Sequence, residues 1–134
     1  MSVRVLIADD HPFVRNGLRS LLREIPDCEV IDEAQDGIDA VEKAIHDKPD
    51  VVVLDISMPR MNGLEACRII RERIPACEVL IVSQHDSKEV QRCARKAGAR
   101  GYVIKSQLRR DLLPAFLAVS QHQRFGRCDD ASWA

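Results

Sequence analysis

The chain has 134 residues, of which 46% are apolar and 31% are charged, and its formal net charge is −1 at pH 7. This composition is typical of one folded domain, and the near-zero net charge gives no reason to expect nucleic acid or an anionic membrane surface as a partner. We expect a cytoplasmic protein, because no apolar run approaches the ~18 residues of a membrane-spanning helix and the N-terminal run is too short for a secretory signal.

Five short apolar runs rich in β-branched residues recur along the chain, at residues 3–8, 28–31, 51–54, 79–82 and 102–104. Each run has the length of a strand and none alternates cleanly with polar residues, which is typical of parallel strands buried on both faces. One-sided helical spacing follows each run, at residues 14–25, 38–45, 64–74, 90–97 and 112–117. Five β-α units in series predict the fold class α/β, with a doubly wound, five-stranded parallel sheet and right-handed crossovers.

Three local features qualify this pattern. Gly98 is expected to end the fourth helix. Pro114 lies inside the last helical pattern, where it would remove a backbone hydrogen bond, so that helix either begins near Asp111 or is kinked. Beyond residue 121 the periodicity fades, so we expect one domain over 1–121 and, over 122–134, a partly disordered tail or the start of a linker.

Polar side chains follow four of the five predicted strands, at the edge where open α/β sheets bind ligands. The first strand delivers Asp9 and Asp10, the third Asp55, the fourth Ser83 and the fifth Lys105. Three neighbouring carboxylates need a cation, and Mg²⁺ is the hard ion that suits carboxylate oxygens. With Mg²⁺ present, Asp55 is a candidate nucleophile for a phosphoryl group. Lys105 would neutralise charge on the phosphoryl oxygens, and the hydroxyl of Ser83 would donate to one of them.

Each of these residues alone has a simpler interpretation. Asp10, which precedes His11 and Pro12, is better explained by itself as a cap of the first helix. Ser83 alone could be another cap, and Lys105 alone is most simply a solvated surface lysine. Their shared position at the carboxyl ends of the predicted strands is what indicates a functional site.

Four segments of the chain, IADDH, VVVLDISMPRMNG, IVSQHD and ARGYVIKS, together resemble the receiver domain of two-component response regulators. The segments DDHPFVRNGL and DISMPRMNGLEA are similar to the subgroup whose receivers precede a helix-turn-helix DNA-binding domain of the LuxR/NarL/FixJ type. The resemblance covers about residues 3–120. It implies a flavodoxin-like (βα)₅ fold with strand order 2-1-3-4-5.

The resemblance also implies a site and a partner. A histidine kinase would phosphorylate Asp55, and Mg²⁺ would be bound by Asp9, Asp10, Asp55 and the backbone carbonyl of Ser57. Lys105 would contact the phosphoryl group together with Ser83.

A switch is implied as well. Ser83 would move toward the phosphoryl group, and Tyr102, the chain's single tyrosine, would rotate inward and change the surface of the fourth helix, fifth strand and fifth helix. That surface, or the face of the first and fifth helices, could form a homodimer. DNA would be bound only by a domain outside this chain, and no membrane partner is expected.

Three residues near the site need separate mention. Ser57 and His85 would flank the path of an attacking water and so tune dephosphorylation. Ser106 stands where many receivers have a proline, often after a cis bond, which leaves the backbone geometry there open.

Other classes of protein remain as alternatives. A metal-dependent phosphohydrolase of the haloacid-dehalogenase type also uses an aspartyl nucleophile, but its first strand should end in D-x-D rather than in adjacent Asp9 and Asp10. A nucleotide-binding module is disfavoured because the chain has no phosphate-binding glycine motif. A phosphorylation-independent docking module is opposed by the complete set of acids with Ser83 and Lys105. The five cysteines include no close pair, so we expect reduced thiols and no zinc site.

Overall fold

The computed structural model of the protein describes residues 2–126. Its parallel strands are β1 (Val3–Ala8), β2 (Cys28–Ala34), β3 (Val51–Leu54), β4 (Glu78–Ser83) and β5 (Gly101–Ile104). The helices between and after them are α1 (Pro12–Leu22), α2 (Gly37–Asp47), α3 (Gly63–Arg73), α4 (Lys88–Lys96) and α5 (Leu108–Ser120), and α5 is preceded by a short 3₁₀ turn, η1 (Lys105–Gln107). The strands form one sheet in the order β2-β1-β3-β4-β5, which confirms the predicted fold class and strand order.

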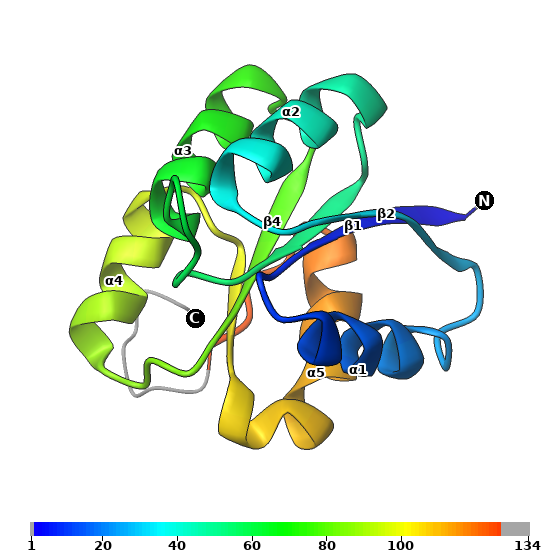
Figure 1. Ribbon diagram of the computed structural model, residues 1–134. Helices are drawn as coiled ribbons and strands as arrows, with labels where there is room; N and C mark the ends of the chain where they lie inside the picture. The colour runs from blue at the N-terminus through cyan, green and yellow to red at the C-terminus, as the bar shows by residue number, and fades with distance from the viewer. Residues whose placement is uncertain (1, 127–134) are drawn as a thin grey trace.

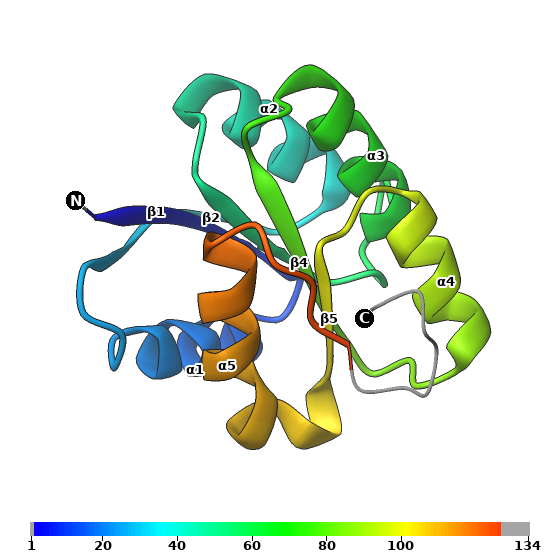
Figure 2. The same ribbon diagram turned by 180° about the vertical axis from the view of Figure 1, so that it is seen from behind.

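Helices cover both faces of the sheet, with α1 and α5 on one face and α2, α3 and α4 on the other (Figures 1 and 2). Strand β3 supplies both cores because successive side chains on a strand point to opposite faces. Val52 and Leu54 pack in the core under α2, α3 and α4, whereas Val51 and Val53 pack in the core under α1 and α5. All four residues are fully buried, which explains why this run has no polar alternation.

Strand β2 extends to Ala34, three residues beyond the predicted end. The additional stretch contains Asp32 and Glu33, which did not look like strand residues. An edge strand tolerates them because Glu33 faces α1, where it pairs with Arg15 at 2.8 Å and also with Arg19. Partial burial would raise the pKa of Glu33, but the two guanidinium groups lower it overall.

Two expectations about the helix ends are settled by the structure. Gly98 follows the last residues of α4 with a φ of +105°, which confirms that it ends this helix. Helix α5 begins at Leu108, directly after η1, so the alternative in which it begins near Asp111 is wrong. Pro114 therefore lies inside the helix, with its ring exposed, and the carbonyl of Arg110 lacks the N–H that residue 114 would normally supply.

The chain beyond α5 returns along the sheet. Phe125 forms a parallel bridge with Gly101, at the outer edge of β5 (Figure 2). Of the predicted tail 122–134, residues 127–134 lie outside the described part of the chain. The contacts of 122–126 with β5 were not indicated by the fading periodicity.

Candidate functional site

Three of the predicted site residues meet at the carboxyl edge of the sheet. Asp9 and Asp55 follow the neighbouring strands β1 and β3, and they are only 1% and 4% exposed. The ammonium nitrogen of Lys105, which follows β5, lies 2.9 Å from Asp9 Oδ2 and 3.3 Å from Asp55 Oδ2. Residues from three separate strands thus form one charged group.

Burial and charge act in opposite directions at this group. Burial raises the pKa of Asp55, and the charge of Asp9 also raises it, whereas Lys105 and the backbone N–H of Ile56 lower it. For Lys105, burial alone would lower the pKa, but the hydrogen bond to Asp9 and the charge of Asp55 raise it overall. The lysine therefore stays protonated, and a single ammonium faces two buried carboxylates.

Asp10 adds a third carboxylate on the same edge. It is half-buried, and ligand atoms of Asp9, Asp10 and His11 lie within 4.8 Å of one another. The interpretation of Asp10 as a helix cap is wrong, because His11 is the N-cap residue of α1 and its N–H donates to Asp9 Oδ1 at 2.9 Å. The carboxylate oxygens in this set fit a hard divalent cation such as Mg²⁺, because three acids with one lysine leave an excess of negative charge.

His85 joins the other three predicted residues. Its backbone N–H donates to Ser83 Oγ at 3.1 Å, its carbonyl accepts from the Tyr102 hydroxyl at 2.7 Å, and its Nε2 lies 3.1 Å from Ser57 Oγ. Ser83 and Tyr102 are buried, whereas Ser57 and His85 are exposed. Within residues 2–126, neither serine side chain forms a hydrogen bond with a site carboxylate or Lys105. The position of His85 two residues after Ser83 indicated proximity to the site, but nothing in the sequence indicated that it connects Ser83 to Tyr102.

A pair that the sequence analysis missed holds the loop after Asp55. Arg60 donates to both carboxylate oxygens of Asp36, at 3.0 and 3.2 Å, while Asp36 also caps α2 by accepting from the N–H of Asp39. The start of α3 packs directly against the backbone of Asp55. Only glycine fits at position 63, because a Cβ there would lie 1.8 Å from the carbonyl oxygen of Asp55. The Asp-Gly and Asn-Gly pairs indicate helix starts, but they carry no signal for the partner of Asp36.

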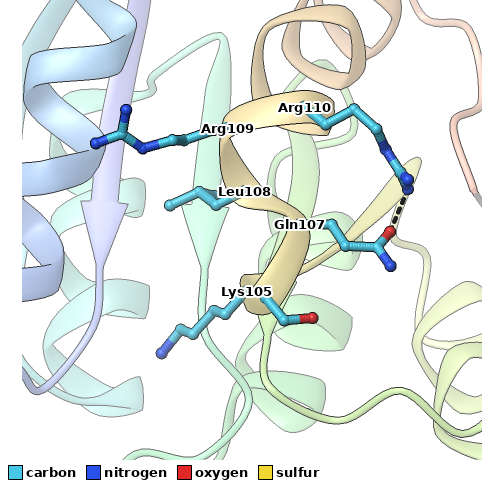
Figure 3. Close-up of a pocket in the computed structure, with 6 residues that line it drawn as sticks. Lys105, Gln107, Leu108, Arg109 and Arg110 are labelled. Carbon is cyan, nitrogen blue, oxygen red and sulfur yellow. Dashed lines mark hydrogen bonds between the residues drawn. The ribbon is translucent and has the colours of Figure 1, made fainter.

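The backbone that positions Lys105 continues as η1 and the first turn of α5 (Figure 3). Residues 105–110 line a pocket here, in which Gln107 and Arg110 are hydrogen-bonded to each other. Lys105 points away from that pair, toward Asp9 and Asp55. None of the described peptide bonds is cis, so Ser106 continues the chain through an ordinary trans bond.

Comparison with known proteins identifies the family of this chain. Residues 5–117 match the model of the response regulator receiver domain. The chain belongs to the response regulator receiver family. It is 37% identical over 119 residues to the transcriptional regulatory protein DegU of Brevibacillus brevis, covering 89% of this chain and 50% of that protein. It is 38% identical over 111 residues to the nitrate/nitrite response regulator protein NarL of Escherichia coli K12, covering 83% and 51%.

A solved receiver-containing protein has the same fold. The crystal structure of a LuxR-family two-component response regulator from Aurantimonas sp. SI85-9A1 superimposes with a TM-score of 0.91 at 35% identity, over 99% of this chain and 95% of that one. The chain spans about half the length of the DegU and NarL relatives. The resemblance read from the four sequence segments is therefore confirmed, including its relation to LuxR- and NarL-type regulators.

Membership has direct consequences for the site. A receiver is a signalling module of a two-component system, and it implies a cognate histidine kinase. The acidic cluster of Asp9 and Asp10 is typical of the metal-binding phosphorylation site of receivers. The family favours a receiver over the haloacid-dehalogenase and nucleotide-binding alternatives. Among residues 2–126, no helix has the length and apolar character needed to cross a membrane.

Proposed function

We propose that this receiver accepts a phosphoryl group on Asp55 from the phosphohistidine of its kinase. The observation that carries the proposal is the position of the Lys105 ammonium between Asp9 and Asp55. Asp55 Oδ1 accepts the N–H of Ile56 at 2.8 Å, and Oδ2 faces the lysine. Oδ2 is thus the oxygen that would form the new P–O bond as the P–N bond of the phosphohistidine breaks.

The side chains around Asp55 have distinct roles in this proposal. Lys105 neutralises charge on the transferred phosphoryl oxygens, and Ser83 donates its hydroxyl to one of them. Asp9, Asp10, Asp55 and the carbonyl of Ser57 would hold Mg²⁺. When bound, this ion supplies positive charge to the same oxygens.

Ser83 and Tyr102 form the proposed switch. Tyr102 is 1% exposed and points inward, and both residues bind the backbone of His85. A movement of Ser83 toward a phosphoryl group would exchange its bond with the His85 N–H for one to the phosphoryl oxygen, and the space that it vacates would favour the inward position of Tyr102. Phosphorylation acts only through differential stabilisation, and inverting a 1:99 population needs about 5.5 kcal/mol. Ser57 and His85, which meet at the exposed side, would tune hydrolysis of the acyl phosphate.

The switched surface is that of α4, β5 and α5, and its output is control of transcription. The similarity to DegU, a transcriptional regulatory protein, supports this output, and DNA would be bound by a domain outside this chain. A homodimer through the α4-β5-α5 surface, or through the α1 and α5 face, would present two such domains together. The cytoplasmic location expected from composition fits a histidine kinase as donor.

The decisive experiment is mass spectrometry after exposure to acetyl phosphate and Mg²⁺. We expect one acid-stable, base-labile phosphoryl group on Asp55, absent in Asp55→Asn and blocked by a chelator. Asp27→Asn is the matched control, because Asp27 is an exposed acid in the turn before β2 and should not affect labelling. Labelling at another residue, or equal labelling without metal, would contradict the proposal.

A further inference from the structure

The segment after α5 is bound to the outer edge of β5, and we refer to residues 121–126 as the strap. The chain reverses through two hydrogen bonds, from the Gln123 N–H to the Ala118 carbonyl at 2.8 Å and from the His122 N–H to the Val119 carbonyl at 2.9 Å. These two bonds are the Schellman ending of a helix. The strap then runs beside β5, the last strand of the sheet (Figure 2).

Backbone hydrogen bonds attach the strap to β5. The carbonyl of Phe125 accepts from the Tyr102 N–H at 2.9 Å, and the Phe125 N–H donates to the Arg100 carbonyl at 3.2 Å. The edge of a sheet carries unpaired N–H and C=O groups, and binding an extended segment satisfies them. The strap therefore occupies a site that would otherwise accept another strand.

His122 fastens the start of the strap. It has a φ of +61°, in the left-handed region where glycine is the usual residue at this position of the motif. Its Nδ1 lies 2.7 Å from Oε2 of Glu78, which is 1% exposed at the start of β4. Glu78 also pairs with Arg71 at 3.0 Å and Arg100 at 2.9 Å. The imidazole contact with this buried carboxylate explains why a histidine holds a backbone conformation that suits glycine better.

Tyr102 is shared between the strap and the switch. Its N–H binds Phe125, and its hydroxyl binds the carbonyl of His85 on the loop after Ser83. Since β5 is an edge strand, the residue that carries this ring has β4 on one side and the strap on the other. The position of the ring and the attachment of the strap therefore depend on the same residue of β5.

We propose that the outer edge of β5 is an interaction surface for the chain's own residues 121–126, fastened by His122 on Glu78, and that the strap and the inward ring of Tyr102 stabilise each other. Such coupling is reciprocal, so a change that favours the inward ring also tightens the strap. This second part rests on the proposed function, because phosphorylation of Asp55 is what would favour the inward ring.

The fastening is tested by hydrogen exchange of single backbone amides in the complete 134-residue chain. His122→Gly should speed exchange of the Tyr102 amide about tenfold, the equivalent of one hydrogen bond to a charged group. The Arg100 amide donates to Val79 on β4 at 2.9 Å and should not change. His122→Asn, which tolerates the same backbone, should behave as the glycine variant does. Gln123→Ala, in the same turn, should leave the exchange rate of the Tyr102 amide at its wild-type value.

The glycine variant separates two explanations of His122. If the histidine served only to end α5, glycine would suit its left-handed backbone better and exchange at Tyr102 would stay the same or slow. Either result would overturn the role of the imidazole.

The coupling is tested with acetyl phosphate and Mg²⁺. Phosphorylation should slow exchange of the Tyr102 amide several-fold, and Asp55→Asn should abolish the effect. If Asp55 carries the phosphoryl group and the exchange rate is unchanged, the coupling is wrong while the proposed function stands. If no phosphoryl group attaches, the proposed function fails, and the His122 variants still decide whether the strap is fastened as proposed.

Discussion

The hydroxyl of Tyr102 donates a 2.7 Å hydrogen bond to the carbonyl oxygen of His85, whose N–H is bound to Ser83 Oγ. One residue of the β4-α4 loop thus connects the hydroxyl predicted to meet the phosphoryl group with the aromatic ring predicted to switch. Burial raises the pKa of Tyr102, so the phenol stays protonated and able to donate. Ser83 and Tyr102 can therefore influence each other through a single backbone segment.

Tyr102→Phe should remove the hydroxyl, with its hydrogen bond to His85 and its interaction with Ser83, while keeping the aromatic ring. We expect the free energy of unfolding to fall by about 1 kcal/mol, the usual net value of one hydrogen bond. Tyr102→Ala should cost roughly 3–5 kcal/mol, because it also leaves a cavity in the core under α4. Urea unfolding measures both values. Equal stability of the phenylalanine variant and the unchanged protein would show that the bond to His85 contributes nothing to the inward position.

Lys105→Met should impair phosphorylation far more than folding. Removing one preorganised positive group from a phosphoryl transfer site costs on the order of 10²-fold in rate. The measurement is the rate of Asp55 labelling by acetyl phosphate with Mg²⁺. Arg109→Met is the matched control, because Arg109 lines the same pocket and, among residues 2–126, it forms no ion pair with Asp9 or Asp55. Labelling of the Lys105 variant at the normal rate would exclude a role for the lysine in the transfer.

Arg60→Ala should lower the free energy of unfolding by an amount that depends on pH. Hydrogen bonds from Arg60 lower the pKa of Asp36 below its ordinary value of 3.8. A carboxyl with a lowered pKa contributes stability that is fully present above its ordinary pKa and is lost as pH falls through the lowered value. The stability difference between the variant and the unchanged protein should therefore be present at pH 7 and shrink below about pH 4.

Arg68→Ala provides the control for that experiment. Arg68 and Arg60 have similar side-chain exposures, 59% and 57%, but within residues 2–126 the one ion pair of Arg68 is with the exposed Glu65, at 3.9 Å. Such a surface pair contributes little, so its loss should leave stability nearly unchanged at both pH values. A pH-independent difference for Arg60→Ala would show that the variant acts by some route other than Asp36.

Pro114→Ala should stabilise the protein. Proline inside a helix is about 3 kcal/mol less favourable than alanine, and Pro114 is exposed, so removing its ring should cost little packing. The alanine N–H would supply the missing hydrogen bond to the Arg110 carbonyl. Urea unfolding should show a gain of roughly 1–3 kcal/mol, whereas Arg109→Ala on the same helix should change stability by less than about 0.5 kcal/mol. A destabilised Pro114→Ala would indicate that the proline has a packing role.

Local patterns in the sequence were sufficient to predict the fold class. The run 51–54 matches β3 at both ends, because a strand buried on both faces shows itself as an unbroken apolar run. Asn62 lies just before the predicted helical pattern 64–74, and it caps α3 by accepting from the Glu65 N–H. The end of β2 could not be predicted, because the charged residues there have partners on two different helices. Glu33 pairs with Arg15 and Arg19 on α1, and Asp32 lies 3.8 Å from Lys43 on α2.

For the site, the sequence by itself determined which residues reach the carboxyl edge of the sheet, because that depends only on where each strand ends and on strand order. Only the tertiary structure decided how they pair. Lys105 lies between Asp9 and Asp55, His85 joins Ser83 to Tyr102, and His122 reaches Glu78 across 44 positions in the chain. The physical reason is that periodicity records burial within one element, whereas a contact between distant residues depends on how separate elements pack, and one sequence carries no local trace of it.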